Sequence, residues 1–398
     1  MRKRKKIKIN ILASFYKDVT TFPVLESTEF ALLSCLSKEK YRLFIINHTP
    51  PSKVHEAREE KNRIPPATVR RWVIPFYNKY INMIFDFLFS IYVIFNYKID
   101  FLYSREIYLS CMGIVLKTIL RKKSIFRMKA LFLQEREYLG ENSFNLALLK
   151  KCEKLLFEKS DLILPCSDNM TEYLKEKGRA GHVLSIPNYI VRDKFFFDQK
   201  IRERVRVDLG IDDRLVFIFS GGPWKWQCLD ESMRLFKLLL ELDKRSYFMV
   251  LSYEKALMQE QLKGSLDKDY FSLLSLEHDE IPPYLMAGDF GFMLRARGLI
   301  SDTSSPIKFG EYIGCGLPVA IAEHLGDFPD IVQDKDFGVV IDNWEDEEGL
   351  RNAAKNIMEY LKSHDLDGKK ALSEWANTNF TWENNIGKFE DGIKSLLS

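Results

Sequence analysis

The stretch Ser301–Asp330, SDTSSPIKFGEYIGCGLPVAIAEHLGDFPD, decides the fold because it alternates loop, short helix, tight turn and strand. Ser304 and Ser305 favour a helix N-cap, and Pro306 suits a first helical turn, where its missing N–H would have no partner. We therefore expect a helix that starts at Ser305 or Pro306 and runs to about Ile313.

Glycines should end this helix after little more than two turns. Gly314-Cys315-Gly316 supplies a left-handed stop, and a strand is expected at 317–321 behind a proline. Free N–H groups and the positive end of the helix dipole at Ser304–Pro306 favour a phosphate or a carboxylate. Lys308 and Glu311 lie one turn apart on one side, where they can bind an anion and hydroxyl groups. The alternative is a capped helix with an ordinary Lys–Glu pair.

Residues 304–320, SSPIKFGEYIGCGLPVA, resemble the donor-site segment of the retaining GT-B glycosyltransferases of family 4, especially the bacterial surface-polysaccharide members. In that family a Ser-Pro-x-Lys-x-x-Glu-Tyr run precedes Gly-x-Pro-Val. The resemblance implies that Glu311 binds the nucleotide ribose and that the helix start cradles the diphosphate. The family's second glutamate, which holds sugar hydroxyls eight positions earlier, is replaced by Thr303.

A glycine loop precedes this segment in the chain. The strand expected at Leu215–Ser220 leads into GGPWKW and then into an amphipathic helix. Gly221 and Gly222 let the backbone approach a ligand without a side-chain clash, and Lys225 can bring positive charge to a phosphate. The position of the loop resembles that of the family's phosphate-contacting loop, which opens the second domain.

Four further basic residues are candidates by position. Arg295 and Arg297 follow the strand expected at Phe290–Leu294, where either guanidinium could reach a diphosphate or form a structural salt bridge. Lys129 stands where the family has a histidine that packs against the donor sugar. This makes Arg127 and Lys129 candidates, with a solvated loop as the alternative.

The length of 398 residues suits two domains better than one core. Alternating strands and helices predict an α/β protein with doubly wound parallel sheets. We expect an N-terminal, acceptor-side Rossmann-like domain over 1–192, joined by a C-terminal helix at 381–398, and a donor-binding domain over 193–380. The resemblance implies a GT-B fold, in which the two domains face each other across a cleft.

Cysteine usage and the N-terminus predict a cytoplasmic protein. The six cysteines show no CxxC spacing, which argues against a zinc site or a disulfide framework. MRKRKKIKINILASF lacks the apolar run and cleavage site of a signal peptide. Ile81–Phe95 contains Asp86 and falls short of the roughly 20 residues that span a bilayer, so we expect a core-facing helix rather than a membrane-interfacial one.

The charge is divided unevenly along the chain. Residues 1–192 hold 34 Lys and Arg against 19 Asp and Glu, a difference of +15, whereas the remainder holds 25 against 37, a difference of −12. The basic half predicts contact with an anionic partner, and we expect docking on the inner face of the cytoplasmic membrane; solvated lysine faces are the alternative. The candidate docking residues are Arg2–Lys6, Arg63, Arg70, Arg71, Lys79, Trp72, Phe76 and Tyr77.

The sequence thus predicts a retaining glycosyltransferase of hexosyltransferase type, which moves a sugar from a nucleoside-diphosphate donor to a glycan or lipid-linked precursor of cell-surface polysaccharide. Lys225, Lys308 and Arg295 would stabilise the leaving diphosphate. No metal or other cofactor and no nucleic acid is expected. One alternative, suggested by Thr303 and Lys129, is a sugar-nucleotide binding protein without transfer activity, and another is a nucleotide-sugar epimerase of the same fold.

Overall fold

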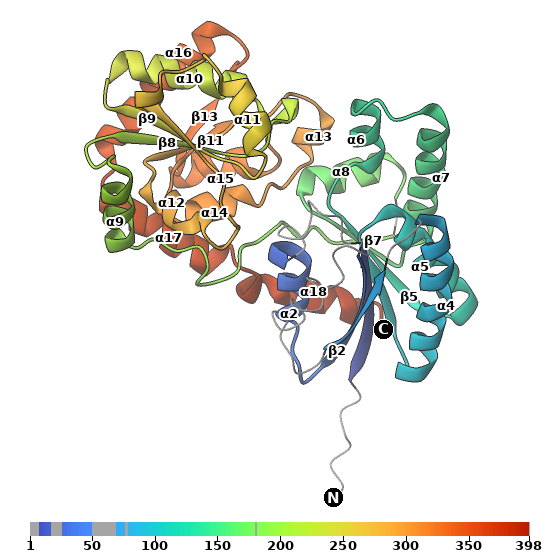
Figure 1. The fold of residues 1–398 in the computed structure, drawn as a ribbon. Coiled ribbons are helices and arrows are strands. Elements are labelled where there is room, and N and C mark those ends of the chain that lie inside the picture. Colours follow the sequence, from blue (N-terminus) through green and yellow to red (C-terminus); the bar gives the residue numbers. More distant parts are fainter. Residues whose placement is uncertain (1–7, 17–25, 50–68, 76–78, 180, 398) are drawn as a thin grey trace, which may run out of the picture. The chain divides into compact units, whose positions relative to one another are not determined.

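The computed structural model describes residues 8–16, 26–49, 69–75, 79–179 and 181–397. The chain forms two compact units, each with a parallel sheet and helices on both faces (Figure 1). The first unit comprises Met1–Pro187 and Asn385–Ser398, and the second comprises Asn188–Asn384. The boundaries differ from those predicted at 192–193 and 381, because the backbone of Ile190 donates to Phe380 and accepts from Trp382 within the second unit.

The first unit holds a seven-stranded sheet in the order β3-β2-β1-β4-β5-β6-β7, and its pairs are parallel. Its strands are β1 (Ile9–Tyr16), β2 (Tyr41–Thr49), β3 (Val69–Pro75), β4 (Phe101–Ser104), β5 (Lys123–Met128), β6 (Leu162–Pro165) and β7 (His182–Val183). Its helices are η1 (Glu26–Phe30), α2 (Ala31–Ser34), α4 (Lys79–Tyr97), α5 (Ile107–Leu120), α6 (Phe132–Tyr138), α7 (Ser143–Lys159) and α8 (Asp168–Glu176), and it includes the end of α18 (Trp382–Ser395).

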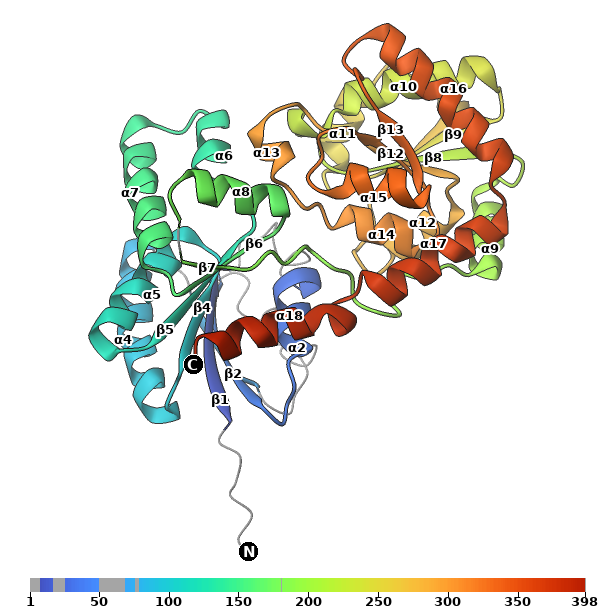
Figure 2. The same cartoon turned by 180° about the vertical axis from the view of Figure 1, so that it is seen from behind.

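Helices cover both faces of this sheet. On one face, Val93 and Ile94 of α4 pack with Leu12, Phe44 and Leu102 in a buried cluster. On the other face lie α2 and the end of α18 (Figures 1 and 2). The ring of Phe389 in α18 meets that of Tyr103 edge-on at 6.0 Å, and Glu390 accepts from the Ser37 N–H.

Helix α4 is only partly the core-facing helix that the sequence predicts. One face of it does point to the core, where Asp86, Ser90, Val93 and Ile94 are buried. The opposite face is open, and five large apolar side chains on it are more than half exposed: Ile84, Phe85, Leu88, Tyr92 and Phe95. The part of the chain that the structure describes contains no helix both long enough and apolar enough to cross a bilayer.

The second unit holds a six-stranded parallel sheet in the order β10-β9-β8-β11-β12-β13. Its strands are β8 (Leu215–Ser220), β9 (Ser246–Leu251), β10 (Phe271–Leu274), β11 (Phe290–Met293), β12 (Val319–Ala322) and β13 (Gly338–Ile341). Its helices are α9 (Gln199–Leu209), η4 (Lys225–Gln227), α10 (Leu229–Leu242), α11 (Lys255–Leu262), η5 (Lys268–Tyr270), α12 (Ile281–Ala287), α13 (Leu299–Asp302), α14 (Lys308–Gly314), α15 (Phe328–Lys335), α16 (Glu347–Ser363) and α17 (Leu366–Asn379).

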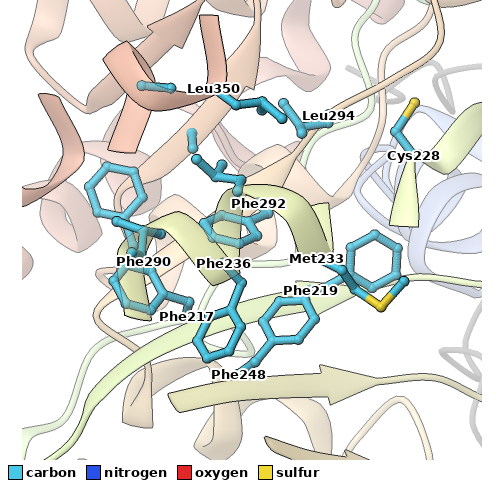
Figure 3. Packing of buried hydrophobic residues seen from close by; sticks show 14 of the residues in the cluster. Phe217, Phe219, Cys228, Met233, Phe236, Phe248, Phe290, Phe292, Leu294 and Leu350 are labelled. Atoms are coloured by element: carbon cyan, nitrogen blue, oxygen red, sulfur yellow. The ribbon is translucent and has the colours of Figure 1, made fainter. Parts of the chain in front are cut away.

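Aromatic side chains form much of the core of the second unit (Figure 3). Phe217 of β8 stacks on Phe292 of β11 at 5.7 Å, and Phe236 of α10 stacks on Phe248 of β9 at 5.0 Å. Helices α10 and α16 cover this face, while α12, α14 and α17 lie on the other (Figures 1 and 2). Burial of such large rings is the main favourable term for folding of this unit.

Candidate functional site

The candidate site lies where the strand order of the second sheet reverses. Strands β8 and β11 are neighbours in the sheet, although β9 and β10 come between them in the chain; these two strands lie on the other side of β8. Loops that leave such a pair turn in opposite directions, so the carboxyl ends of the strands border the usual ligand crevice of an open parallel sheet. Gly221 and Gly222 follow β8, and Arg295 follows β11 at this edge.

Helix α14 supplies the central side chains, but it begins later than predicted. It runs over Lys308–Gly314, with Ile307 at the N-cap and no side-chain capping bond. The predicted cap at Ser304 or Ser305 is wrong because both hydroxyls have other partners. Ser304 donates to the Ser301 carbonyl at 2.8 Å, and the buried Ser305 hydroxyl accepts from the Asn188 N–H at 3.1 Å. Pro306 precedes the helix, and its carbonyl accepts from the Phe309 N–H.

Tyr312 fixes α14 against the end of β8. Its buried hydroxyl accepts a hydrogen bond from the Ser220 N–H at 2.9 Å. A Cβ atom on Gly291 of β11 would lie 2.5 Å from the Tyr312 ring, so only glycine leaves room for this packing. The Tyr312 contact therefore sets the distance between the helix and the glycine loop after β8.

Glu311 is almost completely buried and belongs to a chain of polar contacts. His278 Nε2 lies 3.0 Å from Glu311 Oε1, and Lys194 Nζ lies 3.0 Å from His278 Nδ1 and 2.6 Å from Asp279 Oδ1. An ammonium group has no acceptor, so Nδ1 accepts from Lys194, and Nε2 carries the proton donated to Glu311. No described group donates to the second Glu311 oxygen, which leaves it available to a ligand hydroxyl.

Lys308 is held close to the glycine loop by Gln227. The Gln227 Oε1 atom accepts from the Gly222 N–H at 3.1 Å and lies 3.5 Å from Lys308 Nζ. Burial, with the nearby Arg295 guanidinium, lowers the pKa of Lys308 to about 7, although Glu311 acts in the opposite direction. Among the described residues, no carboxylate lies within ion-pair distance of Lys308.

The two arginines after β11 differ in their surroundings. Arg297 is bound to surface carboxylates, with Nη2 2.6 Å from Glu323 and Nε 3.5 Å from Glu345. Arg295 donates to the Leu294 carbonyl, and burial lowers its pKa. No carboxylate in the described ranges pairs with Arg295, so the geometry favours Arg295 over Arg297 as an anion-binding group.

Lys225 is exposed, unlike Lys308. In the sequence it stands between Trp224 and Trp226, whose rings stack on each other with centroids 5.5 Å apart and an interplanar angle of 4°. A Cβ atom on Gly222 would lie 3.0 Å from the Trp224 ring nitrogen, and a Cβ atom on Gly221 would lie 2.9 Å from the Phe219 ring. The glycines therefore allow tight packing of this loop.

Thr303 occupies the position of the glutamate that the resemblance leads us to look for. It is buried, and its hydroxyl donates to the Leu299 carbonyl one turn earlier at 2.8 Å. This bond is local to α13.

Lys129 lies in the first unit, in a buried cluster at the ends of β4 and β5. Its Nζ atom lies 2.9 Å from the fully buried carboxylate of Glu29, which also accepts from the Tyr103 hydroxyl. Burial tends to raise the pKa of Glu29, but Lys129, Arg127 and Arg105 lower it to about 2. Burial lowers the pKa of Lys129 to about 7, although the Glu29 charge acts in the opposite direction.

Arg127 is also buried in the first unit. It donates to backbone carbonyls, including that of Ile186 at 2.6 Å. The alternative of a solvated loop at 127–129 is therefore wrong, because the Lys129 ammonium is enclosed as well.

Sequence reasoning missed several residues of these clusters. Gln227, Lys194 and the role of His278 depend on contacts across 81, 84 and 33 positions, which no local spacing reveals. Glu29 was missed as the partner of Lys129. Gln227 is the residue that a local signal could have identified, because it is a polar residue just after the glycine loop.

Together these side chains can bind a ligand with several anionic oxygens and vicinal hydroxyl groups. Lys308 and Arg295 supply positive charge, and no carboxylate of the described residues forms an ion pair with either of them. Glu311 supplies a carboxylate acceptor. Among the residues described, no group of three or more His, Cys, Asp or Glu side chains is placed to hold a metal ion.

Comparison with known proteins supports the fold. No protein-family model and no curated protein matches the sequence. The Anabaena protein Alr3699/HepE, solved in complex with UDP, is similar with a TM-score of 0.71 and 14% identity over 98% of this chain and 100% of that chain.

Two further solved structures are similar over nearly their whole lengths. Sucrose-phosphate synthase from Thermosynechococcus elongatus gives a TM-score of 0.68 and 13% identity over 98% of this chain and 99% of its own. A Listeria monocytogenes protein assigned as a UDP-N-acetylglucosamine 2-epimerase gives a TM-score of 0.59 and 12% identity over 98% of this chain and 97% of its own. The chain therefore has the two-domain, Rossmann-like α/β fold of GT-B glycosyltransferases.

Proposed function

We propose that the chain is a retaining glycosyltransferase that moves a hexosyl group from a nucleoside-diphosphate sugar onto a polysaccharide or lipid-linked glycan precursor of the cell surface. The observation that carries this proposal is the pair of half-buried cations, Lys308 and Arg295, beside the buried carboxylate of Glu311. Charges in this arrangement are costly to bury, so the fold maintains them at a cost that binding of an anionic ligand would offset.

The chemistry of sugar transfer matches these groups. As the bond from the sugar to the diphosphate breaks, negative charge grows on the leaving group and positive charge on the sugar. Preorganised cations stabilise the leaving charge more strongly in a dry site than in water. Lys308 and Arg295 would take this role, and the exposed Lys225 would contact the outer part of the diphosphate.

Glu311 would orient the nucleotide through its ribose. Its second oxygen can accept from a ribose hydroxyl while His278 holds the first. By the resemblance to family 4, we propose that the acceptor attacks from the donor's own face and that a leaving phosphate oxygen takes its proton. Under this proposal no side chain acts as a covalent nucleophile, and Lys129 and Thr303 are not needed for the chemical step.

Calorimetric titration of the Glu311→Ala variant with UDP and GDP tests the assignment. Loss of the ribose contact should weaken binding of the preferred nucleotide by about 1–3 kcal/mol. Glu347→Ala is the matched control, because that carboxylate is exposed at the start of α16 and pairs only with surface arginines among the described residues. An unchanged affinity in Glu311→Ala would rule out the ribose role.

Product analysis separates the proposed activity from its alternatives. A transferase forms a glycosylated product only when an acceptor is present. An epimerase, for which the similar fold of the Listeria protein is the supporting observation, would convert the donor without an acceptor. Binding of the donor without either reaction would indicate a sugar-nucleotide binding protein.

A further inference from the structure

The first unit carries an open apolar face on three neighbouring helices. Helix α5 contacts both α4 and α7, and all three lie on one side of the sheet (Figures 1 and 2). Exposed apolar side chains recur at helical spacing, with Ile84, Leu88, Tyr92 and Phe95 on α4. Val115 and Ile119 continue the face on α5, and Phe144 and Leu148 on α7, with Phe144 79% exposed. Contiguous apolar surface of this kind marks an interaction site.

A groove of about 520 Å³ crosses this face. Its walls include Ile84 and Leu88 of α4, Val115 of α5, and Leu148 and Leu155 of α7. Among the described residues of the lining, the polar or polarisable side chains are Tyr108, Cys111, Asn145 and Cys152, and none of them is charged, so the groove suits a hydrocarbon ligand.

A basic rim borders one end of the face. Helices α4, α5 and α7 end just before β4, β5 and β6, which are neighbouring parallel strands, so the three helix ends lie at one edge of the sheet. This edge carries the basic rim: Lys98, Arg121, Lys122, Lys123 and Lys159. Of these, Lys123 lies 3.9 Å from Asp161, and the other four make no ion pair with a described residue.

We propose that α4, α5 and α7 form a docking surface for an anionic phospholipid membrane, with acyl chains against the apolar face and phosphate headgroups at the basic rim. Charge decides between this occupant and a second copy of the chain. The residues of the first unit, 1–187 and 385–398, hold 35 Lys and Arg against 21 Asp and Glu, a net charge of +14. Self-association through this unit would therefore bring like charges together, whereas an anionic membrane attracts them.

This surface differs from the one that the sequence suggests. Trp72, predicted to be interfacial, packs against Phe89 at 5.4 Å and Tyr97 at 5.7 Å in the first unit. Arg2–Lys6, Arg63, Phe76 and Tyr77 lie outside the described residues. The docking proposal does not depend on the proposed transferase activity, because it uses no residue of the second unit.

Sedimentation of the full chain with vesicles tests the proposal. Vesicles of phosphatidylcholine, with and without phosphatidylglycerol, are compared at low and high salt. We expect at least about ten-fold stronger binding to the anionic vesicles at low salt, and a clear loss at high salt. Equal binding to both vesicle types would overturn the proposal.

Two double variants locate the surface. Leu88→Glu with Leu148→Glu should reduce binding about ten-fold or more, and Arg121→Gln with Lys159→Gln should remove most of the preference for anionic lipid. The matched controls, Leu242→Glu with Leu257→Glu and Lys237→Gln with Lys355→Gln, change exposed residues of the second unit and should bind as wild type does. Circular dichroism verifies that each variant is folded.

Either of two results would refute the assignment. One is wild-type vesicle binding by the folded Leu88→Glu, Leu148→Glu variant. The other is a dimer in sedimentation velocity that these substitutions dissociate, which would identify the face as a contact between copies of the chain.

Discussion

Replacing Lys308 by methionine should abolish a pH dependence of nucleotide binding that the wild-type chain shows. Burial lowers the pKa of Lys308 from 10.5 to about 7, so the free site loses this charge as the pH rises above about 7. A bound diphosphate stabilises the ammonium and raises its pKa again. Nucleotide binding above about pH 7 must therefore take up a proton, and the affinity must fall as protons become scarce.

The size of the effect follows from the pKa. The free site is about half protonated at pH 7 and about one-thirtieth protonated at pH 8.5, so the affinity should fall about fifteen-fold, or roughly 1.6 kcal/mol, between these values. The phosphates are already almost fully ionised over this range, and their own titration adds little. In Lys308→Met the affinity should be low at both pH values. In Lys308→Arg, which keeps its charge, it should depend little on pH.

Isothermal titration calorimetry in buffers of different ionisation enthalpy measures both the affinity and the proton uptake. Wild type should take up about half a proton at pH 7 and close to one at pH 8.5. The reasoning is refuted if the wild-type affinity is the same at both values, or if Lys308→Met shows the same loss as wild type.

The same shift has an effect on folding. Between about pH 7 and 10.5 the unfolded chain keeps a proton on Lys308 that the folded chain has released. Stability from this group therefore rises with pH across the window, and the cost of burying the ammonium is fully present below about pH 7. The contribution of Lys308 to folding stability is thus least favourable below about pH 7, where its ammonium carries the charge that an anionic ligand needs.

Two further predictions concern residues around the site. Lys225→Ala should lower kcat with the true donor and acceptor while leaving the melting temperature nearly unchanged, because Lys225 is exposed. A variant that kept the wild-type kcat would exclude Lys225 from the phosphate site. The control is Lys237→Ala, which changes an exposed residue of α10. Asp289→Ala should cost about 3–5 kcal/mol in urea unfolding, since it leaves Arg202 and Arg206 buried without their carboxylate. The control Asp243→Ala breaks an ion pair with Arg245, whose side chain is 63% exposed, and should destabilise the fold much less; an equal loss of stability in both variants would contradict this expectation.

Strong local patterns predicted the sheets well. The apolar run at Leu215–Ser220 became β8 with the expected bounds, and the strand expected at Phe290–Leu294 became β11, which ends one residue earlier at Met293. Strand β3 was missed because the polar residues Arg70 and Arg71 interrupt its apolar pattern. Helix α4 was expected to face the core because Ile81–Phe95 contains Asp86 and is too short to span a bilayer. Nearly every residue in this stretch is apolar, and such a pattern contains no signal for which face stays open.

The start of α14 could not be read from the sequence. The pattern Ser-Ser-Pro favours a cap, but Asn188 lies 117 positions away and takes the Ser305 hydroxyl as its acceptor. A tertiary hydrogen bond thus overrides the local preference. The candidate residues Lys308 and Glu311 were identified by their spacing. Their partners were not, because they come from segments far away in the chain.

Helix α14 shows how one short segment can organise a charged site. Three of its residues reach three different segments, because Lys308 meets Gln227, Glu311 meets His278, and Tyr312 meets Ser220. A helix of seven residues has little stability alone, so these contacts and its packing must hold it in place.

The opposite side of α14 explains why this position is rigid. A Cβ atom on Gly310 would lie 2.7 Å from Ile190, and one on Gly314 would lie 2.9 Å from the same side chain. The helix is therefore pressed against the start of the second unit on one side while its polar residues reach the glycine loop on the other. Electrostatic stabilisation depends on charges that need not reorganise during the reaction. Close packing through glycine provides that condition for Lys308, whose ammonium has no carboxylate among the described residues to hold it.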